Sequence, residues 1–158
     1  MQFGCSVIFG LLLAVAAPSQ PHWQQYANAR FQYSICFPET VLKAQPEAEN
    51  SDGRAFLGND GARLLVYGSE ALRQTLAGHE AETSADLAGK AGKVTYEKHT
   101  LTWYVLSGTS GDTIFYAKTY RSHGQFKSFR LTYPASAAST YNPIAAHLSQ
   151  CFKDLAGQ

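Results

Sequence analysis

Three long extended segments, joined by very short turns, constrain the fold of this chain more than any other feature. The segments read KVTYEKHTLTWYVLSG, DTIFYAKTYR and QFKSFRLTYP, and they lie between Lys93 and Pro134. Strands that are joined by turns of about two to four residues must be antiparallel. Both faces of these strands carry large apolar residues, as at the neighbouring Trp103 and Tyr104. We therefore expect an antiparallel sheet that is covered on both faces.

Other segments predict more strands for the same sheet. Residues 29–38, ARFQYSICFP, alternate with a period of two, which indicates a strand. Residues 54–58 and 62–68 flank an Asn-Asp-Gly turn, which is typical of a hairpin. Residues 44–53 are rich in polar residues and predict a loop.

Helices are expected on the two sides of this sheet. Short helices are predicted from Ser69 to about Leu76 and over residues 85–92, after a cap at Thr83 or Ser84. A C-terminal helix is predicted by apolar residues at helical spacing: Ile144, Leu148, Cys151, Phe152 and Leu155. The expected fold class is α+β, with an antiparallel sheet of about six to seven strands flanked by helices.

The N-terminus has the pattern of a secretory signal. Ser6 to Ala17 is an apolar run that is too short to span a bilayer, and Ala14-Val15-Ala16 supplies a small-x-small cleavage site. We expect a signal peptide over residues 1–16, a polar leader over 17–28 and one domain over 29–158. The alternative is a buried N-terminal helix. A cleaved signal predicts a periplasmic or secreted protein without a membrane span after signal removal.

Two cysteines remain after removal of the signal. Cys36 and Cys151 form an even pair, which in an oxidising compartment predicts one disulfide between the first strand and the last helix. In the chain-entropy model, closing so long a loop stabilises a protein by roughly 4–5 kcal/mol. The alternative is two buried free thiols. Neither cysteine lies in a C-x-x-C motif and metal-site spacing is absent, so we expect no metal and no cofactor.

Composition excludes some classes of partner. The formal net charge is +1, and no run of like charges occurs in the 158 residues. A nucleic-acid partner usually shows as a basic patch, so none is expected. The partner is expected to be a protein or a small ligand of unknown identity, and the protein is expected to be a monomer.

A serine between glycines raises the question of catalysis. Ser110 lies in Gly108-Thr109-Ser110-Gly111-Asp112, which lacks the last glycine of a nucleophile elbow. A strand follows it where an elbow requires a helix. The sequence favours a hairpin tip, and we expect no catalytic residues.

Aromatic and basic residues share the later strands. Such residues are favoured in recognition surfaces. A candidate binding surface is therefore expected from five residues: Tyr116, Lys118, Tyr120, Arg130 and Tyr133. The alternative is that they are ordinary half-buried strand residues.

Three phrases of the sequence carry a resemblance to a known family. ARFQYSICFPETV, SDGRAFLGNDGARLLVYG and TWYVLSGTSGDTIFYAKTY resemble segments of small exported bacterial proteins of the Mog1/PsbP-like fold, over about residues 26–155. The resemblance implies an antiparallel sheet between helices and a role in binding or assembly, and it carries over no functional residue.

The expected function is therefore that of an exported, non-catalytic binding protein. One alternative is an inhibitor or immunity protein against an envelope-acting enzyme, which would use residues 44–53 or 107–112 as a protruding loop. A serine hydrolase that uses Ser110 is a further alternative.

Overall fold

The computed structural model describes residues 21–156. The signal peptide predicted over residues 1–16 and residues 17–20 of the predicted leader lie outside the described residues. Within the described part of the chain, no helix is long and apolar enough to cross a membrane.

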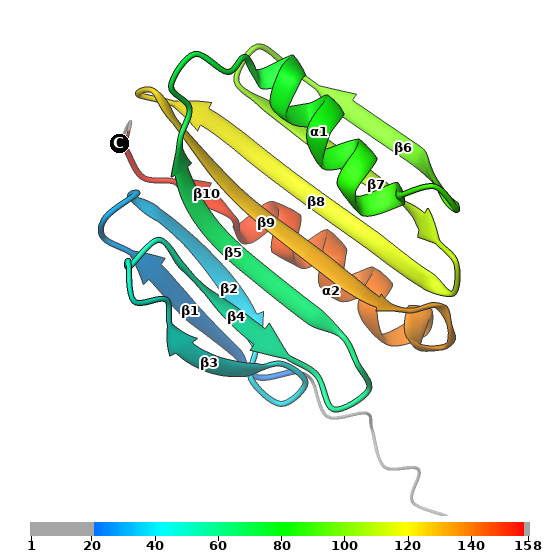
Figure 1. Cartoon of the computed structure of the whole chain (residues 1–158). Coiled ribbons are helices and arrows are strands. Elements are labelled where there is room, and N and C mark those ends of the chain that lie inside the picture. The colour runs from blue at the N-terminus through cyan, green and yellow to red at the C-terminus, as the bar shows by residue number, and fades with distance from the viewer. Residues whose placement is uncertain (1–20, 157–158) are drawn as a thin grey trace, which may run out of the picture.

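A seven-stranded antiparallel sheet forms the centre of the molecule (Figure 1). Its order is β3-β4-β5-β9-β8-β7-β6. The strands are β3 (Lys43–Glu47), β4 (Gly53–Leu57), β5 (Arg63–Glu70), β6 (Gly92–His99), β7 (Trp103–Ser110), β8 (Thr113–Ser122) and β9 (Gln125–Pro134). The meander from β6 to β9 is the one that the short turns predict.

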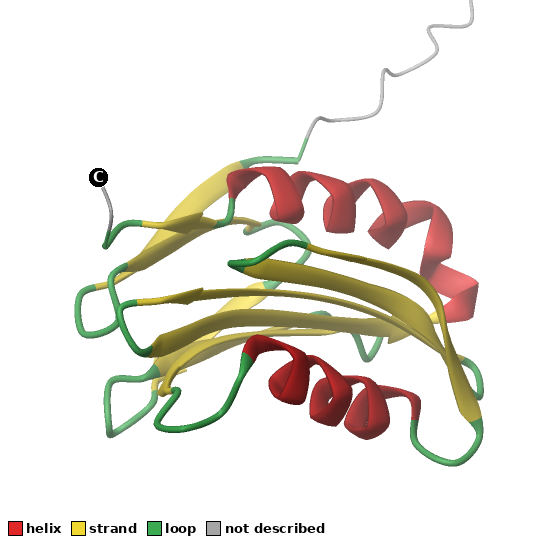
Figure 2. Ribbon diagram, turned by 90° about the horizontal axis from the view of Figure 1, so that it is seen from above, coloured by secondary structure: helices red, strands yellow, loops and turns green. Residues whose placement is uncertain are grey.

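Two helices cover opposite faces of this sheet (Figure 2). Helix α1 (Leu76–Ala88) packs on β6 and β7. Helix α2 (Ala138–Cys151), which follows the short 3-10 helix Ala135–Ala137, packs on β8 and β9 from the other side. The predicted α+β architecture, with a sheet flanked by helices, is confirmed.

A second, three-stranded sheet shares the layer of α2. It consists of β1 (Trp23–Asn28), β2 (Tyr33–Pro38) and β10 (Lys153–Asp154), in the order β1-β2-β10. The first strand that the sequence predicts is β2, and it pairs with β1 and β10 instead of joining the large sheet. Its buried residues pack against the large sheet: Tyr33 and Ile35 belong to the same core cluster as Val66 of β5, and the Tyr33 hydroxyl donates to the Val66 carbonyl at 3.4 Å.

The main core lies between the large sheet and the layer of α2. Phe129 and Leu131 of β9 contribute to it, as do Leu148 of α2 and Phe152 just after it. All four are fully buried, and burial of each such side chain stabilises the fold by about 1.5–3 kcal/mol. The alternation of apolar residues along β9 places Phe129 and Leu131 on this face.

The tight turns between β7 and β8 and between β8 and β9 contain glycines with positive φ. His123 and Gly124 connect β8 to β9 and both have positive φ, at 51° and 74°. Gly111 connects β7 to β8 with φ of 55°. Two-residue hairpin loops require such angles, so the predicted turns at these positions are confirmed.

The helix predictions before β6 are wrong. Ser69 belongs to β5, and the chain forms a single helix that begins at Leu76. The Thr75 hydroxyl caps this helix by accepting a hydrogen bond from the Gly78 N–H at 3.0 Å. Thr83 lies inside the helix and is buried against the sheet. Local capping signals favoured the wrong residues because pairing with β9 extends β5 through Glu70.

Two segments expected to be irregular are strands. Residues 23–28 of the predicted polar leader form β1, because they pair with β2 along the whole of their length. Tyr26 and Asn28 are buried, and the Asn28 amide donates to the Glu47 carboxylate at 3.2 Å and to the Ser51 carbonyl at 3.0 Å. Part of the predicted loop 44–53 likewise pairs with β4 as strand β3. Both β1 and β3 are edge strands with many exposed polar side chains, so the hydrophobic periodicity of their sequences does not reveal them as strands.

The predicted disulfide is present. Cys36 of β2 bonds to Cys151 at the end of α2, with the two Cα atoms 5.8 Å apart. It joins the beginning of the domain to its last helix, as the sequence predicts. A buried ion pair lies in the same region: the completely buried Lys127 of β9 contacts Asp154 of β10, the strand that pairs with β2.

Candidate functional site

An open groove runs between α2 and the outer strands of the large sheet. Its volume is about 530 Å³. Helix α2 covers β8 and β9 but leaves part of β6 and β7 uncovered on this face. The residues that line the groove come from four strands and one helix: Thr95, Tyr96, Ser107, Gly108, Thr109, Ile114, Tyr116, Tyr133, Asn142, Ala145 and Ala146.

Strand alternation and small helix residues create this groove. Ile114 and Tyr116 lie two residues apart on β8, so both side chains are on the α2 face. Ala145 and Ala146 present only methyl groups from α2, and these leave room beside the helix. A β-bulge between Val94 and Tyr96 changes the register of β6 at the outer wall.

Tyrosine rings form the main apolar surface of the groove. Tyr96 is 52% exposed. Tyr116 is half-buried and its ring stacks on Phe129, with centroids 6.0 Å apart. Tyr133 stacks on Tyr141 at 5.2 Å. Tyr96 therefore offers the most exposed ring of the groove, whereas Tyr133 is buried, with 3% of it accessible to solvent.

A few polar groups accompany these rings. The Tyr133 hydroxyl donates to Oδ1 of Asn142 at 2.8 Å, and Asn142 lies exposed on α2. The Asn142 amide nitrogen carries two further donors. The Ser107 hydroxyl donates to the Phe115 carbonyl at 3.1 Å, which fixes its orientation within the sheet.

The tyrosine hydroxyls of the groove are neutral donors at physiological pH. Burial raises the pKa of Tyr116, while a hydrogen bond with Ser149 opposes that effect. Burial also raises the pKa of Tyr133. Neither phenol is therefore available as an anion near neutral pH, and both act as hydrogen-bonding groups.

Four of the five predicted binding residues lie on the α2 face of the sheet. Tyr116 and Tyr133 line the groove. Lys118 and Tyr120 lie further along β8, where they hold the end of α2. The Lys118 ammonium donates to the Ser149 carbonyl at 2.7 Å and lies 4.9 Å from the Tyr120 ring centre. Burial lowers the pKa of Lys118.

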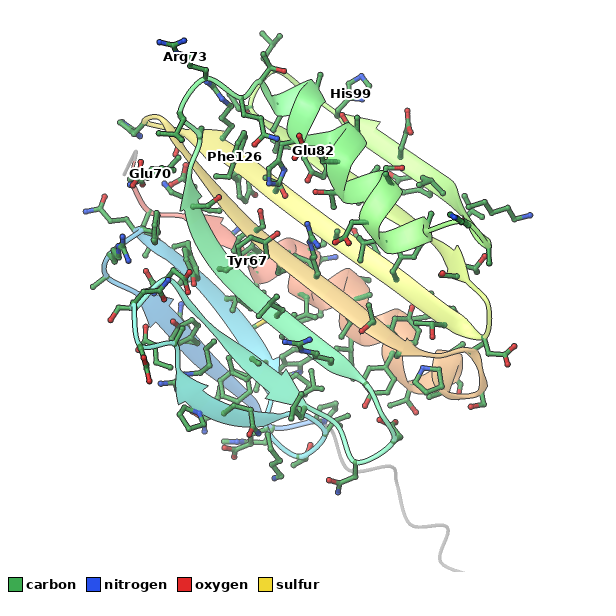
Figure 3. All side chains as sticks on the ribbon, in the orientation of Figure 1. Tyr67, Glu70, Arg73, Glu82, His99 and Phe126 are labelled. Carbon is green, nitrogen blue, oxygen red and sulfur yellow. A yellow bond between two sulfur atoms is a disulfide. The ribbon has the colours of Figure 1, made fainter. Side chains whose placement is uncertain are left out.

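The fifth predicted residue, Arg130, lies on the opposite face of the sheet. It pairs with Asp86 of α1 and its guanidinium donates to the Thr83 hydroxyl at 3.3 Å. It also lies over the ring of Tyr67, at 5.6 Å from the ring centre. Figure 3 shows Tyr67 on β5, beside the part of the sheet that α1 covers. Arg130 pairs with Ala117, the residue next to Tyr116 on β8, and neighbouring residues of a strand point to opposite faces of the sheet. Arg130 and Tyr116 therefore do not share a surface.

Buried polar residues surround Arg130 between α1 and the sheet. The Tyr104 hydroxyl donates to the Thr83 hydroxyl at 2.9 Å and lies 2.8 Å from Nδ1 of His79. Burial raises the pKa of Tyr104 to about 12 and lowers the pKa of His79. The His79 ring also stacks on Phe126 at 4.1 Å. These contacts position α1 on the sheet.

Ser110 ends strand β7 at the hairpin tip. Its hydroxyl donates to the Ala88 carbonyl at the end of α1, at 2.9 Å. Among the hydrogen bonds of residues 21–156, none joins Ser110 to a histidine. The hairpin that the sequence favours at this serine is confirmed.

Sequence reasoning missed most of the groove. Tyr96 and Ser107 pair with each other across the β6–β7 hairpin, but Asn142 comes from α2, which is far from them in the chain. The alternation along β8 places Tyr116 on one face, but no sequence signal tells which strands and which helix meet it there. The hairpins bring the strand residues together, and tertiary packing alone brings α2 and Asn142 to them.

Comparison with known proteins supports the fold. No family model matches the chain, and no curated protein matches it. The solution structure of cyanobacterial PsbP (CyanoP) from Synechocystis sp. PCC 6803 is similar, with a TM-score of 0.61 and 13% sequence identity. The match covers 90% of this chain and 98% of that chain.

The chain has a PsbP-like fold. That finding confirms the resemblance read from the sequence phrases. At this sequence identity the similarity concerns the fold alone, and the function has to be argued from the site.

Proposed function

We propose that this protein is an exported, non-catalytic binding protein that takes a small ligand in the groove between α2 and strands β6–β8. The ligand is a flat, mainly apolar molecule with at least one hydrogen-bonding group. The observation that carries this proposal is the tyrosine-lined groove itself, with its volume of about 530 Å³.

The size and lining of the groove support a small ligand. Small-molecule sites usually have volumes of about 300–1,000 Å³ and combine apolar walls with a few polar groups. Here Tyr96 and Tyr116 supply the walls, and Asn142 supplies the polar group at the rim. Stacking of Tyr116 on Phe129 and the Tyr133–Asn142 hydrogen bond hold two wall residues in place before a ligand arrives. Such pre-organisation lowers the entropic cost of binding.

Export is supported by the N-terminal sequence and by the disulfide. The small-x-small site at Ala14-Val15-Ala16 predicts cleavage. Disulfides persist mainly in oxidising compartments, and Cys36 is bonded to Cys151. Together these features favour the periplasm or the exterior.

The groove is tested by filling it. Ala146 is exposed on α2 and lines the groove, so Ala146→Trp places a large ring in the binding volume without entering the core. Ala81→Trp on the exposed side of α1 is the matched control. The probe is anilinonaphthalene sulfonate, whose fluorescence rises in apolar sites.

We expect saturable dye binding to the mature protein and to Ala81→Trp, and an affinity at least about tenfold weaker for Ala146→Trp, equivalent to about 1.4 kcal/mol. Mass spectrometry of the protein purified from its own host under native conditions should then find a bound small molecule that the dye displaces. Equal dye binding by all three proteins would contradict the proposal.

A protein partner is the other outcome of this test. An inhibitor or immunity protein is expected to insert a loop into its target. The mature chain, used as bait in an envelope extract, would then retain an enzyme equally well with and without Ala146→Trp. That result would favour a protein interface away from the groove.

A further inference from the structure

A histidine lies beside the disulfide that joins β2 to α2. The side-chain ligand atoms of Cys36, His147 and Cys151 all lie within 4.8 Å of one another. His147 precedes Cys151 by one helical turn, so both project from the same side of α2. Cys36 faces them from β2.

We propose that reduction of the Cys36–Cys151 disulfide creates a binding site for Zn²⁺, with two thiolates and the His147 imidazole as ligands. A dithiol supplies two electrons and two protons, becomes a disulfide itself and leaves two thiols on the protein. Zn²⁺ then binds both sulfurs and one imidazole nitrogen, and the two thiol protons are released to solvent. Exchange with a second disulfide reverses this step: that disulfide takes up two electrons and two protons and becomes a dithiol, the Cys36–Cys151 disulfide re-forms, and Zn²⁺ is released.

The distances fit such a site. Zinc binds sulfur at about 2.3 Å and imidazole nitrogen at about 2.0–2.1 Å, so tetrahedral ligand atoms lie about 3.5–3.8 Å apart. The present atoms lie within 4.8 Å, and the Cα atoms of the two cysteines are 5.8 Å apart. After the sulfurs separate, side-chain rotation brings all three atoms to zinc distances. Three protein ligands leave a fourth position for water or for an external ligand.

Neighbouring groups would support the ligands. The backbone N–H of Cys36 donates to Sγ of Cys151 at 3.1 Å, a contact that stabilises a thiolate. The Trp23 ring packs on the His147 ring with centroids 4.0 Å apart, which orients the imidazole. His147 is exposed and the two cysteines are half-buried, so an ion reaches the site from solvent.

This site is independent of the proposed binding groove. None of its three residues lines the groove, since α2 presents Ala145 and Ala146 to the groove and His147 to the disulfide. Zinc binding and dye binding are therefore separately testable, and either can fail alone.

Cobalt(II) is the spectroscopic probe for the test. The mature protein is reduced with a phosphine under anaerobic conditions and titrated with Co²⁺, and Zn²⁺ is then added in competition. We expect the absorption bands of tetrahedral cobalt thiolate only in the reduced protein, and loss of those bands as Zn²⁺ replaces Co²⁺. His147→Ala should weaken Co²⁺ binding by about tenfold to a hundredfold. His99→Ala, on the exposed edge strand β6, is the matched control and should bind as the wild type does.

Three results would overturn the proposal. One is the absence of cobalt bands in reduced protein whose circular dichroism remains native. Another is an unchanged affinity in His147→Ala. The third is unfolding on reduction, because the site requires β2 and α2 to stay packed together.

Discussion

Replacing Asp154 by Asn should destabilise the protein strongly, because it leaves a buried charge without its partner. The side chain of Lys127 is completely buried and that of Asp154 is 19% exposed. The Lys127 ammonium contacts the Asp154 carboxylate and donates to the Ser122 hydroxyl at 2.8 Å. Asn keeps the shape of Asp but not its charge.

The expected cost follows from this burial. Removing one partner of a buried ion pair usually costs about 3–5 kcal/mol. Because water still reaches part of Asp154, the lower end of that range applies, so Asp154→Asn should lose about 3 kcal/mol. Adding Lys127→Met removes the orphaned charge and should recover part of this loss, which gives a coupling energy of about 0.5–3 kcal/mol.

Urea unfolding, followed by circular dichroism, measures these differences. Asp86→Asn is the matched control, because Asp86 pairs with Arg130 but is 67% exposed. An exposed pair of this kind contributes less than about 1 kcal/mol. A loss below about 1 kcal/mol in Asp154→Asn, or an equal loss in Asp86→Asn, would refute the argument that burial of Lys127 sets the magnitude.

Three further predictions concern pH, the disulfide and Ser110. Burial, with a contribution from the positive charge of Arg130, holds the pKa of His79 below its usual value of 6.5, so the unfolded chain takes up the proton first. Stability should therefore fall as the pH drops below that value, and His79→Phe should flatten this dependence when urea unfolding is compared at about pH 7 and about pH 5. The double variant Cys36→Ala/Cys151→Ala should lose about 4–5 kcal/mol of unfolding free energy under non-reducing conditions, because it opens a loop of 115 residues. Ser110→Ala should lose only about 1 kcal/mol with its hydrogen bond to Ala88, and a fluorophosphonate should not label the wild-type protein; labelling at Ser110 would contradict a purely structural role.

The sequence predicted the meander and its turns because the residues that specify them are neighbours in the chain. Gly111, His123 and Gly124 lie where the chain must reverse direction within two residues, and positive φ is required there. The helix starts before β6 were mispredicted because several residues could cap a helix. Thr75 is the residue that caps α1, because β5 pairs with β9 as far as Glu70 and so keeps Ser69 in a strand. This pairing joins residues that are far apart in the chain.

The candidate site was only partly predictable. Alternation along β8 correctly put Tyr116, Lys118 and Tyr120 on one face. It did not reveal that the last two hold α2, through the Ser149 and Phe152 carbonyls, while Tyr116 opens to the groove. Arg130 was included in the predicted surface because of its residue type. It lies three residues before Tyr133 on β9, so the two side chains point to opposite faces of the sheet.

The sequence by itself determined the α+β class, the antiparallel order of the later strands and the pairing of Cys36 with Cys151. Periodicity and turn chemistry act between neighbours, and the two cysteines outside the predicted signal peptide allow only one disulfide. Tertiary structure alone decided that β1 and β2 form a separate sheet, that α2 leaves a groove beside Tyr96, and that His147 lies next to the disulfide. The contacts that set these features join residues far apart in the chain. Their strength depends on which surfaces are buried together, and no local pattern encodes that.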